Sequence, residues 1–338
     1  MKSDDGNFGY PMNLHAYATR GIIWGQRKVF KEWLKGRVAG HGMMPLDYRG
    51  QAANDAIREL ILSRKPCLVA RFGCVELEAT LRGYDISRPG SRLKKFAQLF
   101  TGSCGPFWWD NSIKAGMLRT TGVFPADEAT LMRFAECSLE SARPIDILGT
   151  WNAREWFLSR QFFPKAKAVH LDDLNAFRYE KPWTSALEGR RVLVVHPFDE
   201  TIRSQYARRE LLFADKAVLP PFELLTYKPV TSFLGLETPY RDWFEALDKM
   251  CRDIAALDFD VAILGCGAYG MPLGAFIKQK LGRQAVHLGG VTQILFGIRG
   301  GRWDNFPMIN RFYNDAWVRP GDSERPANFR QHEGGAYW

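Results

Sequence analysis

The sequence has no apolar run that approaches the ~20 consecutive residues required for a membrane-spanning helix. It also has no N-terminal secretory signal, no Cys-x-x-Cys pair and no His at metal-ligand spacing from a Cys. These absences argue against an integral membrane protein, a secreted disulfide scaffold and a structural zinc domain. We therefore expect a cytoplasmic protein whose six cysteines are reduced thiols.

The sequence contains no long block of Lys and Arg, no internal repeat and no low-complexity linker. Basic residues are spread along the chain, so nucleic acid is not indicated as a partner. The formal net charge of +9 nevertheless favours anionic partners, such as nucleotide diphosphates or an acidic membrane surface. With 46% hydrophobic residues, 11 Trp and 23 Phe, the chain can build a large aromatic core or expose platforms for carbohydrate.

The clearest motif is a glycine cluster that follows the apolar run 261–264 and precedes a segment of helical character at 271–281. A second apolar run at 285–288 follows, and this order predicts a strand, a tight turn, a helix and a second strand of a parallel α/β sheet. The glycines of the turn let backbone N–H groups approach a phosphate, and the helix presents its positive end. We expect a nucleotide diphosphate to bind the turn, which comprises Gly265, Gly267, Ala268, Tyr269 and Gly270.

The same glycines match the dinucleotide fingerprint Gly-x-Gly-x-x-Gly. A dinucleotide fold requires Asp or Glu roughly 20 residues further on to hold the ribose hydroxyls, but that place holds His287 and Leu288. Three interpretations stay open: a nucleotide-sugar phosphate site, an NAD-type site, and glycines that only permit close helix–strand packing. His287 is a candidate for acid–base or phosphate work, and Gly289 with Gly290 is a candidate second anion nest.

A second informative stretch lies early in the chain. The short apolar run 67–70 predicts a buried strand, which continues into Arg71-Phe72-Gly73-Cys74-Val75-Glu76-Leu77 at the start of a helix. A carboxylate in the first helical turn suits the helix dipole, which would account for Glu76 without any chemistry. Alternatively, Arg71 and Glu76 point into a cleft at the carboxyl end of the strand, where open α/β sheets bind ligands.

A strand followed by Arg-Phe-Gly-x-x-Glu-Leu and a helix resembles the N-terminal signature of the GT-D type glycosyltransferases, which are bacterial enzymes. The order of the later elements also corresponds, so the resemblance covers roughly residues 50–300. It implies a Rossmann-like fold, a nucleotide-sugar donor, and transfer of the sugar to a glycan or lipid-linked acceptor in bacterial surface polysaccharide synthesis. It also implies that Arg71 and Gly73 contact the nucleotide-sugar donor.

The chain departs from that family at the metal motif Asp-x-Glu, because Cys74 stands in the place of the Asp. Mn²⁺ and Mg²⁺ prefer oxygen ligands, and a thiol is a poor substitute. Either Glu76 holds the metal as its one remaining ligand, or Arg and Lys side chains meet the charge of the donor phosphates. In the second case we expect Glu76 to act as the base that deprotonates the acceptor hydroxyl.

A third strand is predicted at 191–195, and His196 follows it directly. A His in this position either contacts phosphate, acts as an acid or base, or is a hydrogen-bonded structural residue. Arg203 lies one helical turn beyond Asp199 and Glu200. It is a candidate phosphate clamp, because a guanidinium binds phosphate through two donors, and the alternative is an ion pair with those carboxylates.

Three regions are expected in the chain. Residues 1–45 form an N-terminal arm, in which the basic amphipathic segment 21–38 either contacts an anionic membrane surface or packs on the body. Residues 46–310 form the α/β domain, with a mostly parallel sheet flanked by helices. The tail 311–338 ends in Tyr and Trp, so we expect it to fold back on the body.

The sequence therefore predicts a cytoplasmic glycosyltransferase, peripheral to the inner face of the membrane if the arm binds lipid. Its catalytic residues are expected to be Glu76, His196 and Arg203. Two rivals are retained: an NAD(P)-dependent oxidoreductase that uses the Gly265–Gly270 loop, and a nucleotide-binding protein without catalytic activity. The sequence does not indicate the sugar, the nucleobase, the stereochemical outcome or the oligomeric state.

Overall fold

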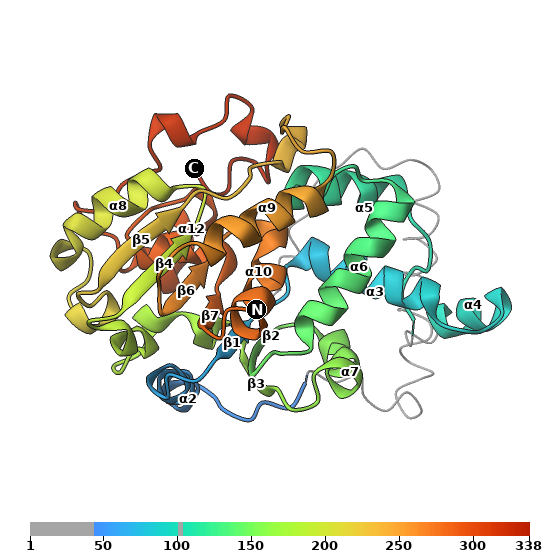
Figure 1. Ribbon diagram of the computed structural model, residues 1–338, viewed down its shortest axis with the longest axis horizontal. Coiled ribbons are helices and arrows are strands. Elements are labelled where there is room, and N and C mark those ends of the chain that lie inside the picture. Colours follow the sequence, from blue (N-terminus) through green and yellow to red (C-terminus); the bar gives the residue numbers. More distant parts are fainter. Residues whose placement is uncertain (1–43, 101–103) are drawn as a thin grey trace.

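The computed structural model describes residues 44–100 and 104–338. The segment 21–38, with its expected basic helix, lies outside these residues. The described chain folds around a seven-stranded, fully parallel sheet in the order β3-β2-β1-β7-β6-β4-β5 (Figure 1). The strands are β1 (Cys67–Ala70), β2 (Ile147–Thr150), β3 (Lys167–His170), β4 (Arg191–Val195), β5 (Glu223–Tyr227), β6 (Val261–Leu264) and β7 (Gln284–His287).

This architecture confirms the predicted α/β, Rossmann-like class. Strands β1 and β6 read as continuous apolar runs because helices cover both faces of the sheet, and every residue of β1, β6 and β7 is buried. The register pairs Val195 of β4 with Leu264 of β6, and Leu264 with His287 of β7. The loops that follow these strands therefore begin at the same edge of the sheet.

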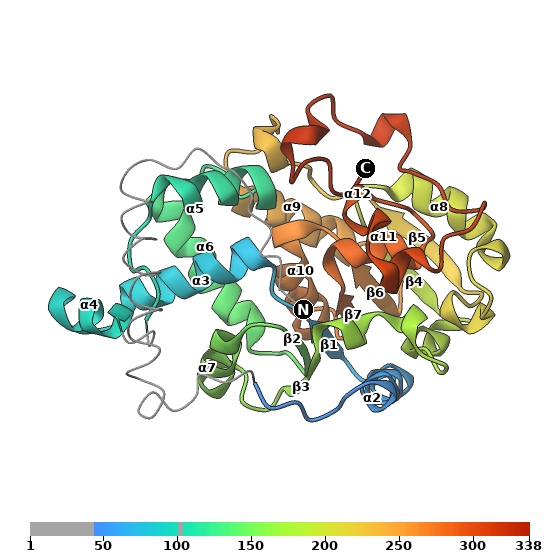
Figure 2. The ribbon, with the colours of Figure 1, turned by 180° about the vertical axis from the view of Figure 1, so that it is seen from behind.

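The helices form a layer on each face of the sheet. Figure 1 shows α9 and α10 in front of the sheet, and Figure 2 shows α11 and α12 on the opposite side. The helices are α2 (Gln51–Leu62), α3 (Cys74–Ser87), α4 (Arg92–Phe100), α5 (Asn111–Gly116), α6 (Glu128–Ala142), α7 (Ala153–Phe162), α8 (Asp199–Ala207), α9 (Trp243–Ala255), α10 (Gly270–Gln279), α11 (Thr292–Leu295), α12 (Gly301–Asp304) and α13 (Pro307–Asn310). None of the described helices is both long and apolar enough to span a bilayer.

Helix boundaries follow local capping. The periodicity around α9 predicts a helix over 238–257, but the helix begins at Trp243. The reason is Asp242, whose side chain accepts a hydrogen bond of 2.8 Å from the backbone N–H of Glu245. The sequence also predicts a strand over 224–230, but β5 ends at Tyr227, shortly before Pro229, which has no N–H to donate to a ladder.

The final residues of the chain pack against the body. Trp317 is buried, and its indole N–H donates to the carbonyl of Leu212 over 2.9 Å. Further on, the backbone N–H of Arg302 donates to the carbonyl of Ala336 over 2.9 Å. These contacts bring the last seven residues, 332–338, to the carboxyl edge of the sheet, where they join the loops that follow the central strands.

Candidate functional site

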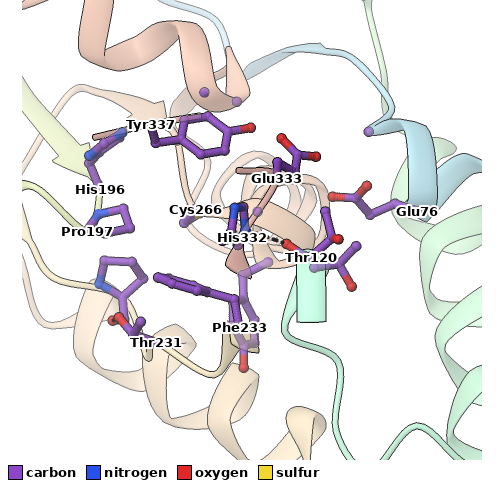
Figure 3. Close-up of a pocket in the computed structure, with 18 of the residues that line it drawn as sticks. Glu76, Thr120, His196, Pro197, Thr231, Phe233, Cys266, His332, Glu333 and Tyr337 are labelled. Carbon is purple, nitrogen blue, oxygen red and sulfur yellow. Dashed lines mark hydrogen bonds between the residues drawn. The ribbon is translucent and has the colours of Figure 1, made fainter. Parts of the chain in front are cut away.

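A cavity of about 190 Å³ opens at the carboxyl edge of the sheet (Figure 3). Its walls come from the loops that follow five strands, from the end of the π-helical segment Met117–Thr121 after α5, and from the tail. The lining residues are 71 and 73–76 after β1, 120–121, 196–198 after β4, 229–233 after β5, 265–267 and 269 after β6, His287 at the end of β7 with 289–290 after it, and Arg302 with 332–333 and 337–338. The early and the late glycine-containing loops thus face one space, as ligand sites in open α/β sheets require.

Several of the glycines make room for side chains that line or back this cavity. A Cβ atom at Gly73 would lie 2.0 Å from Oε2 of Glu76. A Cβ at Gly265 would lie 2.6 Å from Cδ2 of His196, and one at Gly270 would lie 2.3 Å from Nε2 of His287. Real Cβ atoms do not tolerate such distances, so these positions accept the side chains only because they are glycine.

The pair after β7 has the same role. A Cβ at Gly289 would lie 3.2 Å from a guanidinium nitrogen of Arg71, and one at Gly290 would lie 2.4 Å from Cε1 of Tyr337. Gly267 differs, because its φ is +58° and the nearest atom to an added Cβ is a carbonyl oxygen at 3.6 Å. Gly267 therefore leaves its backbone open to the cavity, in a conformation that favours glycine.

Two arginines and two carboxylates give the cavity its charge. Arg302 forms an ion pair with Glu333 and donates to the phenol oxygen of Tyr337 over 3.0 Å. The carboxylates of Glu76 and Glu333 point toward one another across the cavity (Figure 3). Burial raises the pKa of Glu76, Arg71 opposes this effect, and the negative charge of Glu333 adds to it.

Two buried histidines, His196 and His287, line the cavity. Burial lowers the pKa of His196 and of His287 to about 3, so both imidazoles are neutral at pH 7. The Nδ1 atom of His196 accepts a 3.0 Å hydrogen bond from the backbone N–H of Phe198. The proton of His196 is therefore on Nε2, which makes this side chain a hydrogen-bond donor rather than a general base.

A third histidine reaches the cavity from the tail. His332 donates from Nε2 to the carbonyl of Thr120 over 3.1 Å, and burial lowers its pKa. The Nδ1 atoms of His332 and His287 are buried without a partner among the described residues. Unpaired buried nitrogens are rare in folded proteins, and they mark this wall as one where polar groups are not fully satisfied by the protein itself.

Three residues expected at the site do not line the cavity. Arg203 lies on α8 with half of its side chain exposed, and it bonds Asp199 over 2.9 Å. The two residues have i,i+4 spacing, so their ion pair holds the guanidinium along the surface of the helix, as in the ion-pair alternative. Arg203 therefore does not reach the cavity as a clamp or catalytic group. Ala268 lines a neighbouring space of about 20 Å³, and Gly270 is buried behind His287.

The residues around Glu76 do not fit a metal site made by the protein alone. Among residues 44–100 and 104–338, no group of three or more His, Cys, Asp or Glu side chains is placed to hold a metal ion. Burial and the nearby carboxylates raise the pKa of Cys74, so its thiol stays protonated and is a weak ligand. The carboxylate that faces Glu76 is already paired with Arg302.

Four residues that line the cavity, namely Arg302, Glu333, Tyr337 and Trp338, belong to no motif that predicted a role for them. The available signal was the aromatic end of a polar tail, together with the Glu-Gly-Gly run at 333–335. Both Gly334 and Gly335 have positive φ, at +71° and +85°. Consecutive glycines before two aromatic residues therefore marked a sharp turn that returns the chain to the body.

Comparison of the chain with models of protein families, with curated proteins and with solved structures gave no significant match in any of the three. The fold and the geometry of the cavity are therefore the observations from which a function is inferred.

Proposed function

We propose that this chain is a glycosyltransferase that takes a sugar from a nucleoside diphosphate donor. The observation that carries the proposal is the meeting, in one cavity, of the 71–76 loop after β1 and the 265–269 loop after β6. One loop brings a cation and the partly buried carboxylate of Glu76, and the other brings an open glycine backbone before α10. A sugar diphosphate and a hydroxyl acceptor require this combination of groups.

The diphosphate has a suitable place between Arg71 and Gly267. No hydrogen bond or ion pair with another described side chain occupies the Arg71 guanidinium, whose donors are therefore free for an anion. Gly267 offers backbone at the start of the segment that leads into α10, where the helix dipole favours negative charge. Arg302 also lines the cavity and, paired with Glu333, brings a second guanidinium to it.

The transfer then needs only groups that line this cavity. The acceptor oxygen attacks the anomeric carbon of the donor while the bond from that carbon to the diphosphate oxygen breaks. The bonding electron pair leaves with the diphosphate, whose charge Arg71 stabilises, and the acceptor proton passes to the carboxylate of Glu76. Burial raises the pKa of Glu76, which makes its carboxylate a stronger base for this proton.

A thermal-shift screen tests the proposal. Nucleoside diphosphates and their sugars, with and without Mn²⁺, are compared with NADH and NADPH at equal concentrations, because a ligand that binds only the folded state raises the melting temperature. We expect the diphosphates to raise it without added metal, and the nicotinamide cofactors to leave it unchanged. A shift with NADH, or none with any diphosphate, would overturn the proposal.

Turnover separates an enzyme from a protein that only binds nucleotide. Wild type is expected to hydrolyse its donor slowly when water replaces the acceptor, and Glu76→Gln is expected to bind the donor without hydrolysing it. Equal hydrolysis rates in both proteins would reject the assignment of Glu76 as the base.

A further inference from the structure

The turn at 332–335 holds one residue in an unusual backbone conformation. Glu333 has φ of +48°, and the next two residues, Gly334 and Gly335, also have positive φ. Glycine adopts this region freely, but for Glu it is disfavoured, and such residues persist where the surrounding structure holds them in place. They are concentrated at functional sites, so the position of the Glu333 side chain is informative.

Contacts on both sides fix this turn. Arg302 pairs with the Glu333 carboxylate and also bonds the Tyr337 hydroxyl. His332 bonds the carbonyl of Thr120, on the other side of the cavity, and its ring lies 5.9 Å from that of Trp338. The turn is therefore anchored to the elements on either side of the opening, and the Glu333 carboxylate is held at the wall between them (Figure 3).

The Glu333 carboxylate also faces the cavity in which a ligand would bind. About 23% of its side chain is exposed, and it points toward Glu76, which comes from the first turn of α3. Two carboxylates on facing walls suit a ligand that carries several hydroxyl groups, because ionised carboxylates only accept hydrogen bonds. They also repel a ligand whose reacting end is itself an anion.

We propose that Glu333 is a ligand-contacting residue of this cavity which, together with Glu76, selects a carbohydrate acceptor with neighbouring hydroxyl groups. This inference rests on the proposed function and narrows it. Glu76 takes the proton of the hydroxyl that attacks, and Glu333 accepts a hydrogen bond from the hydroxyl beside it. An acceptor whose reacting group is a bare lipid phosphate is disfavoured, because both carboxylates repel it.

Two substitutions test the role of Glu333, so that the test still holds if one of the variants fails to fold. Glu333→Gln keeps the size of the side chain and removes its charge. Glu333→Asn also removes the charge, and it suits the backbone, because Asn adopts positive φ more readily than Glu. The matched control is Glu140→Gln, since Glu140 also forms an ion pair, with Arg143, but on an exposed surface outside the cavity lining.

The measurement is isothermal titration of the full chain, first with nucleoside diphosphate and then, at saturating diphosphate, with neutral mono- and disaccharides. We expect saccharide affinity to fall about 10- to 100-fold in both Glu333 variants and to be unchanged in Glu140→Gln, because a hydrogen bond to a charged group is lost. Diphosphate affinity is expected to stay within about threefold of wild type in all three variants.

The remaining outcomes are also decisive. Saccharide binding that is equal in wild type and both Glu333 variants overturns this inference and leaves the proposed function standing. Diphosphate binding without any saccharide binding in wild type also overturns it, while the donor half of the function survives. Wild type that binds neither ligand overturns both.

Discussion

The carboxylate of Glu76 lies over the backbone of Gly73, so closely that a Cβ atom at position 73 would be 2.0 Å from Oε2 of Glu76. We therefore expect Gly73→Ala to displace the carboxylate from the cavity wall. The displaced group is the end of a flexible side chain, so stability should fall by no more than about 1 kcal/mol. Donor turnover should fall to the level of Glu76→Gln, measured as initial rates at saturating donor.

The double variant Gly73→Ala with Glu76→Gln gives the internal control. If the glycine acts through the carboxylate, the double variant should be no less active than either single variant, since effects on one shared group do not add. Gly321→Ala is a matched outer control, because an added Cβ there meets only ordinary contacts, the nearest at 3.5 Å. Additive losses would show that Gly73 has a separate role.

Arg71 and Arg203 give a second comparison, since one lines the cavity and the other is paired with Asp199 on α8. We expect Arg71→Gln to weaken nucleoside diphosphate binding about 10- to 100-fold, as expected for loss of charge-assisted hydrogen bonds. Arg203→Gln should leave that affinity unchanged. Titration calorimetry of both variants against wild type measures the difference. Equal losses would mean that charge at a distance, and not contact, attracts the diphosphate.

The sequence carried enough information for the fold and for the place where two loops meet. Short apolar runs ended by Arg71, His196 and Gly265 indicated parallel strands, and parallel strands bring their carboxyl ends to one edge. The glycines were predicted to be functional positions, but the sequence did not show which group each of them approaches. A pattern of glycines shows where the chain comes close to something, and it does not distinguish a phosphate from the imidazole of His196 or His287.

The part of the cavity lined by Arg302 and the tail depends on tertiary contacts that no local sequence pattern predicts. Arg302 and Glu333 meet because the tail crosses α12, and that crossing depends on a turn whose residues lie outside any periodic element. Arg203 shows the opposite case. Its position predicted a phosphate clamp, with an ion pair to Asp199 or Glu200 as the alternative, and sequence alone gave no means to choose between them.

The buried histidine His196 predicts how stability depends on pH. Its pKa is about 3 in the folded protein and 6.5 in the reference state, so the unfolded chain binds the extra proton below pH 6.5. The contribution of His196 to stability is therefore constant above that pH and is lost as the pH falls from 6.5 toward 3. At pH 5 the loss from this residue should be about 2 kcal/mol. Urea unfolding of wild type and His196→Gln at pH 8 and pH 5 measures it, and the variant should lose less stability on acidification.

Glu76 is expected to change stability with pH in the opposite direction. Its pKa is raised in the folded state, so the folded chain binds the extra proton, and stability falls as the pH rises above the reference value of 4.5. Glu76→Gln should therefore be more stable than wild type at pH 8, with the advantage disappearing near pH 4. A variant that is less stable at pH 8 would show that a partner outside the described contacts stabilises the ionised carboxylate.

Trp243 connects the core to the glycine loop. Its side chain is fully buried, and its ring stacks on that of Tyr269, with ring centres 4.9 Å apart and planes 8° apart. Trp243→Ala should cost about 3–5 kcal/mol of unfolding free energy, through lost burial and the cavity left behind. Trp243→Phe should cost clearly less, because it keeps a ring and removes an indole N–H that is buried without a partner among the described residues. Chemical denaturation of both variants decides the point. A Phe variant as unstable as the Ala variant would mean that the indole N–H is bonded in solution, and that Trp243 positions Tyr269 through that bond.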